Sequence, residues 1–302
     1  MASFAAVDKD VVNASNESGE QNEKVANIDV STVAYIYDLA TQPTEVDTGF
    51  RKCIIERHEN FHIRGVRPHA TFSIRFGTPQ SDDENTSRLW AQRHMLAQNA
   101  FYVISASPYD LDKKRNERSE HFLGKLKRIH GSVLYEGVLY RNEERKPLVG
   151  IVYDHDRNNH NDRKMEVGIP TSSVSSVEEF SQNFKMIRHE GAQNSAQFPA
   201  VEYYNQITDD PELMKSPEIL EKFQVDGEAT ALVVSAKNFQ LVKSEPYRLQ
   251  YRNTNSEDDT PKVVLQLGKL DSNLFTCYYT APFTLLQAFM IALSRFETQQ
   301  KY

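Results

Sequence analysis

The residues best suited to metal chemistry are a run of aspartates and histidines, DHDRNNHND, from Asp154 to Asp162. Three carboxylates and two imidazoles within nine residues resemble a metal-binding loop. A calcium loop of the EF-hand type would need glycine at position 159 and glutamate at position 165, where this chain has asparagine and methionine. We therefore interpret the run as a polar hairpin loop and expect no metal site.

Catalytic motifs are missing from the sequence, although it holds nine histidines and many carboxylates. We find no HExxH pair, no G-x-S-x-G elbow, no Walker A loop and no glycine-rich dinucleotide fingerprint. These patterns supply the paired nucleophiles, bases and phosphate cradles that most enzymes need. We expect a protein that is not an enzyme and that uses no cofactor.

A pair of lysines, Lys125 and Lys127, offers a different chemistry. They stand in the run HFLGKLKRI, which is typical of a β-strand. Alternate residues of a strand share a face, so both ammonium groups should point one way. The residues expected on the opposite face are Phe122, Gly124 and Leu126. Taken alone, such a pair is most often a solvated face or a guarded sheet edge.

Composition limits the partners of the chain. It has 302 residues and a net charge of −7, which argues against nonspecific coating of nucleic acid and confines any polyanion site to a local patch. Cys53 and Cys277, the two cysteines, each lie in an apolar, β-rich run. We expect them to be reduced core thiols in a cytoplasmic protein.

The N-terminus lacks the pattern of a secretory signal, and Ala2 replaces the glycine that myristoylation requires. Residues 1–25 are polar and should be disordered, whereas residues 25–40 are more apolar and could form a helix or a strand. We therefore divide the chain into an arm, residues 1–45, that is disordered or binds a partner, and a domain over residues 46–302.

From about residue 48 the chain reads as many short strands, with no helical segments alternating between them and no internal repeat. The exception is PFTLLQAFMIALSRF, from Pro282 to Phe296, which has helical composition and is apolar around most of its circumference. It is shorter than the ~20 residues of a membrane span. We expect a mainly β fold, a closed antiparallel barrel of about twelve strands, around this central C-terminal α-helix.

Three segments resemble the tubby C-terminal domain of tubby-like proteins: FLGKLKRI at 122–129, KNFQLV at 237–242 and VVLQLGKLDSNLFTCYYTAPFTLLQAFMIALSRFE at 263–297. The last is similar to the family's ending, in which a QFG-like strand, an FT-x-x-Y strand and a proline-led LQAF-x-IALS-x-F helix follow in that order. Weaker similarity extends over residues 48–300. The resemblance implies a twelve-stranded barrel around a central helix, in agreement with the pattern above.

The same resemblance implies a ligand, phosphatidylinositol 4,5-bisphosphate. Family positions that hold its phosphates correspond to Lys125, Lys127 and Arg163. Further headgroup contacts would come from Arg93 and Asn99, just before and at the start of the FYVIS strand. Lysines can act as point charges on adjacent phosphates, and an arginine can bind one bidentately.

The implied role is a phosphoinositide-binding membrane adaptor, peripheral at the plasma membrane or the cilium, in the trafficking of membrane proteins. Its N-terminal arm would recruit intraflagellar transport proteins. Two alternatives stay open. One is a nuclear transcription regulator that binds nucleic acid, which the acidic net charge disfavours. The other is a scaffold that has lost lipid binding.

Overall fold

The computed structural model of the chain describes residues 30–44, 49–58, 70–76, 88–96, 99–112, 119–129, 134–141, 144–155, 163–171, 174, 176–190, 201–206, 232, 233, 235, 237–243 and 263–297. Some of the side chains within these ranges lie outside the description. The predicted hairpin loop in the aspartate and histidine run also falls outside the description, because residues 156–162 do.

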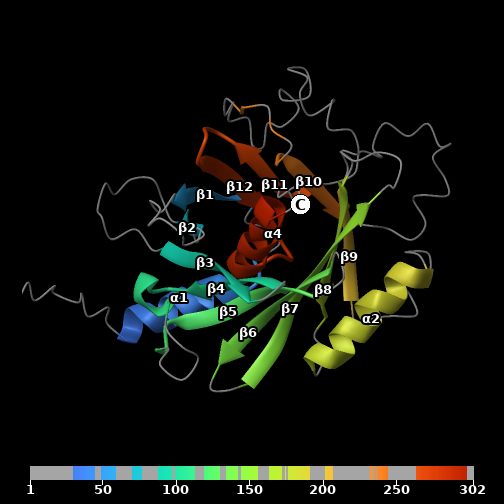
Figure 1. Cartoon of the computed structure of the whole chain (residues 1–302), viewed down its shortest axis with the longest axis horizontal. Coiled ribbons are helices and arrows are strands. Elements are labelled where there is room, and N and C mark those ends of the chain that lie inside the picture. Colours follow the sequence, from blue (N-terminus) through green and yellow to red (C-terminus); the bar gives the residue numbers. More distant parts are fainter. Residues whose placement is uncertain are drawn as a thin grey trace, which may run out of the picture.

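Within the described residues, twelve antiparallel strands follow one another in sequence order, and β1 pairs with both β2 and β12, so that the sheet is a barrel (Figure 1). The expected mainly β, antiparallel fold with a C-terminal helix is confirmed. The strands are β1 (Arg51–His58), β2 (Thr71–Phe76), β3 (Arg88–Leu96), β4 (Asn99–Ser105), β5 (Phe122–Arg128), β6 (Leu134–Arg141), β7 (Glu144–His155), β8 (Arg163–Pro170), β9 (Val201–Gln206), β10 (Phe239–Lys243), β11 (Val263–Lys269) and β12 (Leu274–Tyr279).

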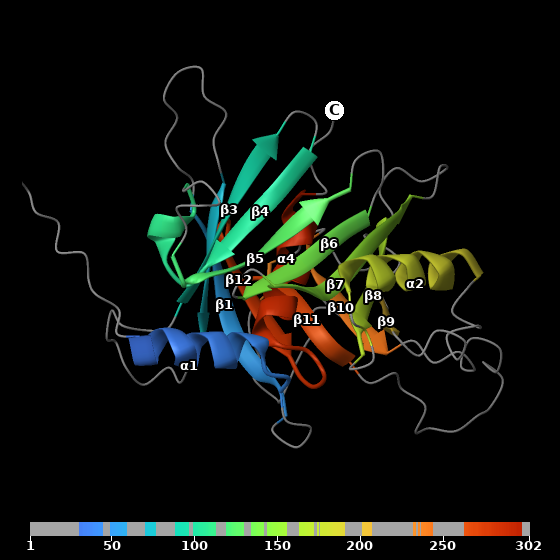
Figure 2. The ribbon, with the colours of Figure 1, turned by 90° about the horizontal axis from the view of Figure 1, so that it is seen from below.

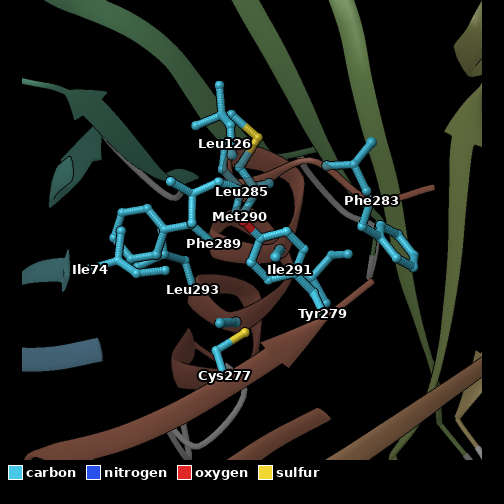
Figure 3. Close-up of a cluster of buried hydrophobic side chains, with 14 of the residues drawn as sticks. Ile74, Leu126, Cys277, Tyr279, Phe283, Leu285, Phe289, Met290, Ile291 and Leu293 are labelled. Carbon is cyan, nitrogen blue, oxygen red and sulfur yellow. The ribbon is translucent and has the colours of Figure 1, made fainter. Parts of the chain in front are cut away.

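The C-terminal helix α4 (Leu285–Glu297) lies inside this ring of strands (Figure 1). Every side chain from Leu285 to Leu293 is buried, and Figure 3 shows Phe289, Met290 and Leu293 among residues of the surrounding strands. Two glycines let the helix approach the wall. A Cβ at Gly137 would stand 2.5 Å from Met290 Sδ, and one at Gly124 would stand 2.5 Å from Val138 O and 3.2 Å from Met290 Cε.

The start of α4 differs from that of the predicted helical run, which begins at Pro282. Thr284 is the cap: its Oγ1 accepts a hydrogen bond from Gln287 N at 3.1 Å, and Gln287 Oε1 accepts one from Thr284 N at 2.9 Å. This reciprocal capping box fixes the helix start at Leu285. The amide of Gln287 also donates to Leu148 O at 2.9 Å, which ties the helix to β7.

The helix α1 (Val30–Thr41) lies across the barrel end where α4 begins (Figure 2). Ile36 and Ala40 are buried in the same core as α4, and Thr44 donates from its backbone N–H to Phe283 O at 3.3 Å. Residues 30–44, part of the predicted arm, therefore pack onto the barrel. The rest of that arm, residues 1–29 and 45, lies outside the described residues.

A third helix, α2 (Val177–Glu190), lies along the outside of the barrel beside β7, β8 and β9 (Figure 2). Two of its own side chains, Phe180 and Phe184, are buried, and a Cβ at Gly150 of β7 would stand 2.5 Å from the Phe184 ring. One short 3-10 helix, η1 (Pro108–Asp110), follows β4. The apolar run ATALVVSA at 229–236 is typical of a strand, but its described positions, 232, 233 and 235, are not part of one.

Candidate functional site

The lysine pair lies on the outer face of β5. Gly124 and Leu126 face α4 and the core, so the alternating positions, Lys125 and Lys127, face outward, as predicted. Lys125 is partly buried, with its Nζ 5.7 Å from the ring centroid of Phe101 and 5.9 Å from that of Tyr140. Lys127 is exposed. The two lysines therefore have different surroundings: Lys125 lies between two aromatic rings, and Lys127 is in solvent.

Aromatic rings extend this surface on both sides of β5. Tyr140 of β6 lies 5.3 Å from the Phe122 ring, and Phe101 of β4 stacks on His94 of β3 at 5.2 Å and 13°. We call the set Phe101, Phe122, Lys125, Lys127 and Tyr140 the outer patch. The sequence predicted only the two lysines of this patch and not its aromatic side chains. The alternation in FYVIS and GVLYR is the signal that would have placed Phe101 and Tyr140 on one face of the sheet.

The prediction that Phe122 faces the core is wrong, because the β4–β5 register shifts between Ile104 and Ser105. Gly124 pairs with Ile104 but Phe122 pairs with Ser105, so one residue of β5 is left between them. Leu123 enters the core in place of Phe122, and it is 1% exposed.

The charge around Lys127 is set by the neighbouring strand. Its partner in the β5–β6 register is Glu136, whose carboxylate accepts a hydrogen bond from Ser181 Oγ of α2. Glu136 therefore links the edge of the outer patch to α2.

The two lysines are about 7 Å apart along the strand, a spacing that suits two phosphate groups on one small ring.

The other predicted headgroup residues lie at the barrel end where α4 finishes. Arg163 is the first residue of β8, opposite His155 of β7, and β8 is three strands from β5. Asn99 begins β4 opposite Leu96. The side chains of Arg163 and Asn99 lie outside the described set. Leu89, Ala91 and Arg93 are spaced two residues apart on β3 and therefore share one face. Because Leu89 and Ala91 lie in the core, Arg93 faces the barrel interior and not the outer patch.

One pair of side chains has the geometry of a catalytic dyad but not its exposure. His58 Nε2 is 2.8 Å from Ser73 Oγ, and burial lowers the pKa of His58, with Arg88 and Arg75 acting in the same direction. Ser73 is fully buried, so no substrate can reach its hydroxyl. Among the described residues no cluster of histidine, cysteine, aspartate and glutamate could hold a metal ion, and no helix is long and apolar enough to cross a membrane.

Comparison with known proteins supplies the family. The model of the Tub family matches residues 40–298. Curated relatives include Tubby-like F-box protein 6 of Oryza sativa subsp. japonica, 41% identical over 88 residues, and Tubby-like F-box protein 11 of the same rice, 45% identical over 67 residues. Tubby-like F-box protein 6 of Arabidopsis thaliana is 36% identical over 88 residues.

These matches are partial. They cover 28%, 22% and 28% of this chain and 20%, 15% and 21% of the respective relatives, so the chain matches about a fifth or less of their length. The family model, by contrast, spans the barrel from the end of α1 to the end of α4. This chain belongs to the Tub family.

Proposed function

We propose that this chain is a phosphoinositide-binding membrane adaptor whose preferred lipid is phosphatidylinositol 4,5-bisphosphate. The observation that carries the proposal is the outer patch, in which Lys125 and Lys127 stand on one face of β5 beside three aromatic rings. Family membership supports the same assignment, because tubby-like proteins are known to bind phosphoinositides.

The two lysines would have different roles at the headgroup. Lys125 is held by Phe101 and Tyr140, so it loses little side-chain freedom when a phosphate binds. Lys127 is exposed and free to follow a second phosphate. Phe101 and Phe122 are apolar and Tyr140 also carries a hydroxyl, a combination that suits the boundary between headgroups and acyl chains. Arg163, whose side chain lies outside the described set, is proposed as a third cation on the resemblance alone.

The adaptor part of the proposal rests on the resemblance. Residues 1–29 would recruit a partner, for which intraflagellar transport proteins are the proposed class, and the barrel would hold the complex at the plasma membrane or the cilium. The curated relatives named above are plant F-box proteins, so they lend the ciliary part no support. Nucleic-acid binding in the nucleus is less well supported, because the net charge is −7.

Co-sedimentation with liposomes tests lipid binding. The chain is titrated with phosphatidylcholine vesicles that contain or lack phosphatidylinositol 4,5-bisphosphate, and with vesicles in which phosphatidylserine supplies the same charge. The test variant is Lys125→Ala with Lys127→Ala. The control is Lys52→Ala with Lys146→Ala, which removes the same charge from strand positions outside the patch. Lys52 also lies over a ring, 5.7 Å from the Tyr278 centroid, so the control matches the lost cation–π contact.

We expect the test variant to lose roughly tenfold or more in affinity for phosphoinositide vesicles, since each charge-assisted phosphate contact contributes about 1.5–3 kcal/mol. The control should bind as the wild type does. Equal binding by both double variants and the wild type would refute the site. Equal binding to phosphatidylserine vesicles would refute the preference for the phosphoinositide.

A further inference from the structure

A second group of cations lies away from the outer patch, at the barrel end where α4 finishes. Arg57 is on the same face of β1 as the core residues Cys53 and Ile55, four and two residues before it. Lys269 is likewise on the same face of β11 as the core residues Leu265 and Leu267. Both therefore face the barrel interior at its rim. Ile55, Phe275 and Lys269 stand in one row across β1, β12 and β11, which places β1 about 10 Å from β11.

The floor of this rim is aromatic. Phe296, on the last turn of α4, stacks on Phe72 at 4.9 Å and meets the edge of Phe275 at 4.7 Å. Phe72 in turn lies 6.0 Å from Tyr102. Phe72, Phe275 and Tyr102 are buried, whereas Phe296 is only partly buried, so these rings close the core at this end.

A third cation, Lys237, stands over this floor. Its Nζ is 5.2 Å from the Phe296 centroid and 5.6 Å from the Phe275 centroid. The position is fixed by its neighbour Asn238, which is 1% exposed. The Asn238 amide donates to Val233 O at 3.0 Å and accepts from Lys269 N at 2.8 Å, so it fastens the turn before β10 to the end of β11.

The three cations repel one another. Burial and the nearby charges of Arg57 and Lys269 together lower the pKa of Lys237 to about 8, and burial is the largest of these causes. The ion pairs found among the described residues involve other side chains, Arg75, Lys146 and Lys243. An arrangement that concentrates like charges over a partly desolvated floor is unfavourable by itself, and an anion placed among them would relieve the repulsion.

We propose that Arg57, Lys237 and Lys269 form a second anion site, at the rim of the barrel, for a compact ligand that carries phosphate groups. A phosphate ligand fits better than a monocarboxylate because its charge of about −2 or more matches three cations, and because the Arg57 guanidinium can bind two of its oxygens at once. The site lies on the inward-facing positions of the strands, so it is separate from the outer patch.

Inorganic pyrophosphate is the probe, titrated into the full chain by calorimetry at constant ionic strength, with sodium sulfate as the comparison anion. The test variant is Lys237→Met with Lys269→Met, which removes two charges and keeps most of the side-chain volume. A second variant, Arg57→Lys, keeps the charge but loses the planar fork. The control is Lys52→Met with Lys146→Met, and circular dichroism checks that all variants fold.

We expect one pyrophosphate site in the wild type and in the control, a loss of roughly tenfold or more in the double variant, and an intermediate loss in Arg57→Lys. Binding should also take up protons near pH 8, because the anion raises the pKa of Lys237. Proton uptake is measured from the dependence of the binding enthalpy on the buffer, and it should vanish in the double variant.

Two results would overturn the site: no pyrophosphate binding above that of sulfate, or equal binding by the double variant and the control. The outer patch variant separates this inference from the proposed function. If Lys125→Ala with Lys127→Ala abolishes pyrophosphate binding while the rim variant retains it, the anion binds at the outer patch and the rim site is wrong. If the rim variant also loses vesicle binding while the outer patch variant keeps it, the phosphate that the rim binds belongs to a lipid headgroup.

Discussion

The Phe289 side chain gives the sharpest test of the helix within the barrel. It is fully buried at the middle of α4, and Figure 3 shows it among core side chains with Leu293 and Ile74 beside it. Phe289→Ala removes the ring and leaves a void. The surrounding wall is paired strand to strand, so it has little freedom to move inward and fill that void.

The magnitude follows from this rigidity. Replacing a buried phenylalanine by alanine costs about 3–5 kcal/mol, and a wall that does not relax favours the upper part of that range. Alanine is the better helix former, which returns about 0.5 kcal/mol. We expect the free energy of unfolding to fall by about 4 kcal/mol, a large part of the 5–15 kcal/mol that is typical of a domain.

Urea unfolding followed by circular dichroism measures this change. The matched control is Phe122→Ala, which removes the same ring from the outer patch, where it is only partly buried and packs on Tyr140. We expect the control to lose about 1–2 kcal/mol. Phe289→Leu, which leaves a smaller void, should fall between the two. A cost for Phe289→Ala no larger than that for Phe122→Ala would refute the enclosed position of the helix.

Three further changes test other parts of the structure. Gly150→Ala places a methyl group against the Phe184 ring, so α2 should exchange its amide hydrogens faster while the barrel strands stay protected; unchanged exchange in α2 would refute its docking. Burial raises the pKa of Cys53 to about 12 and that of Cys277 well above its ordinary value, so a thiol reagent should label neither cysteine in the folded chain and both in urea, and stability should fall as the pH rises above about 9. Lys237 has a pKa near 8, below its ordinary value, so it opposes folding below that pH and the opposition fades as pH rises toward 10.5; Lys237→Met should therefore stabilise the chain most at neutral pH, and a constant difference across this range would contradict the shift.

Much of the fold could be predicted from the sequence because its signals are local. The apolar run of α4 has no polar face wide enough for a surface helix, so this helix requires an enclosing wall. The short strands before it in the sequence supply that wall. The helix begins at Leu285, three residues after the start of the predicted run at Pro282, because Thr284 and Gln287 form a capping box.

Other features depend on tertiary contacts that no local pattern reveals. Phe122 faces outward because the β4–β5 register shifts, and such a shift cannot be seen in β5 alone. The apolar run at 229–236 resembles a strand, yet Leu232 packs over Gly268 and the turn is held by Asn238. The predicted face of Lys125 is confirmed, because strict alternation suffices there.

Hydrogen exchange with phosphatidylinositol 4,5-bisphosphate vesicles tests the central claim most directly, because it locates the lipid on the barrel. Outer-face binding at Lys125 and Lys127 predicts slower amide exchange in β5 and in its neighbours β4 and β6 when these vesicles are added, and no slowing with phosphatidylcholine vesicles. Slower exchange confined to strands remote from β5, such as β10 and β11, would contradict the claim.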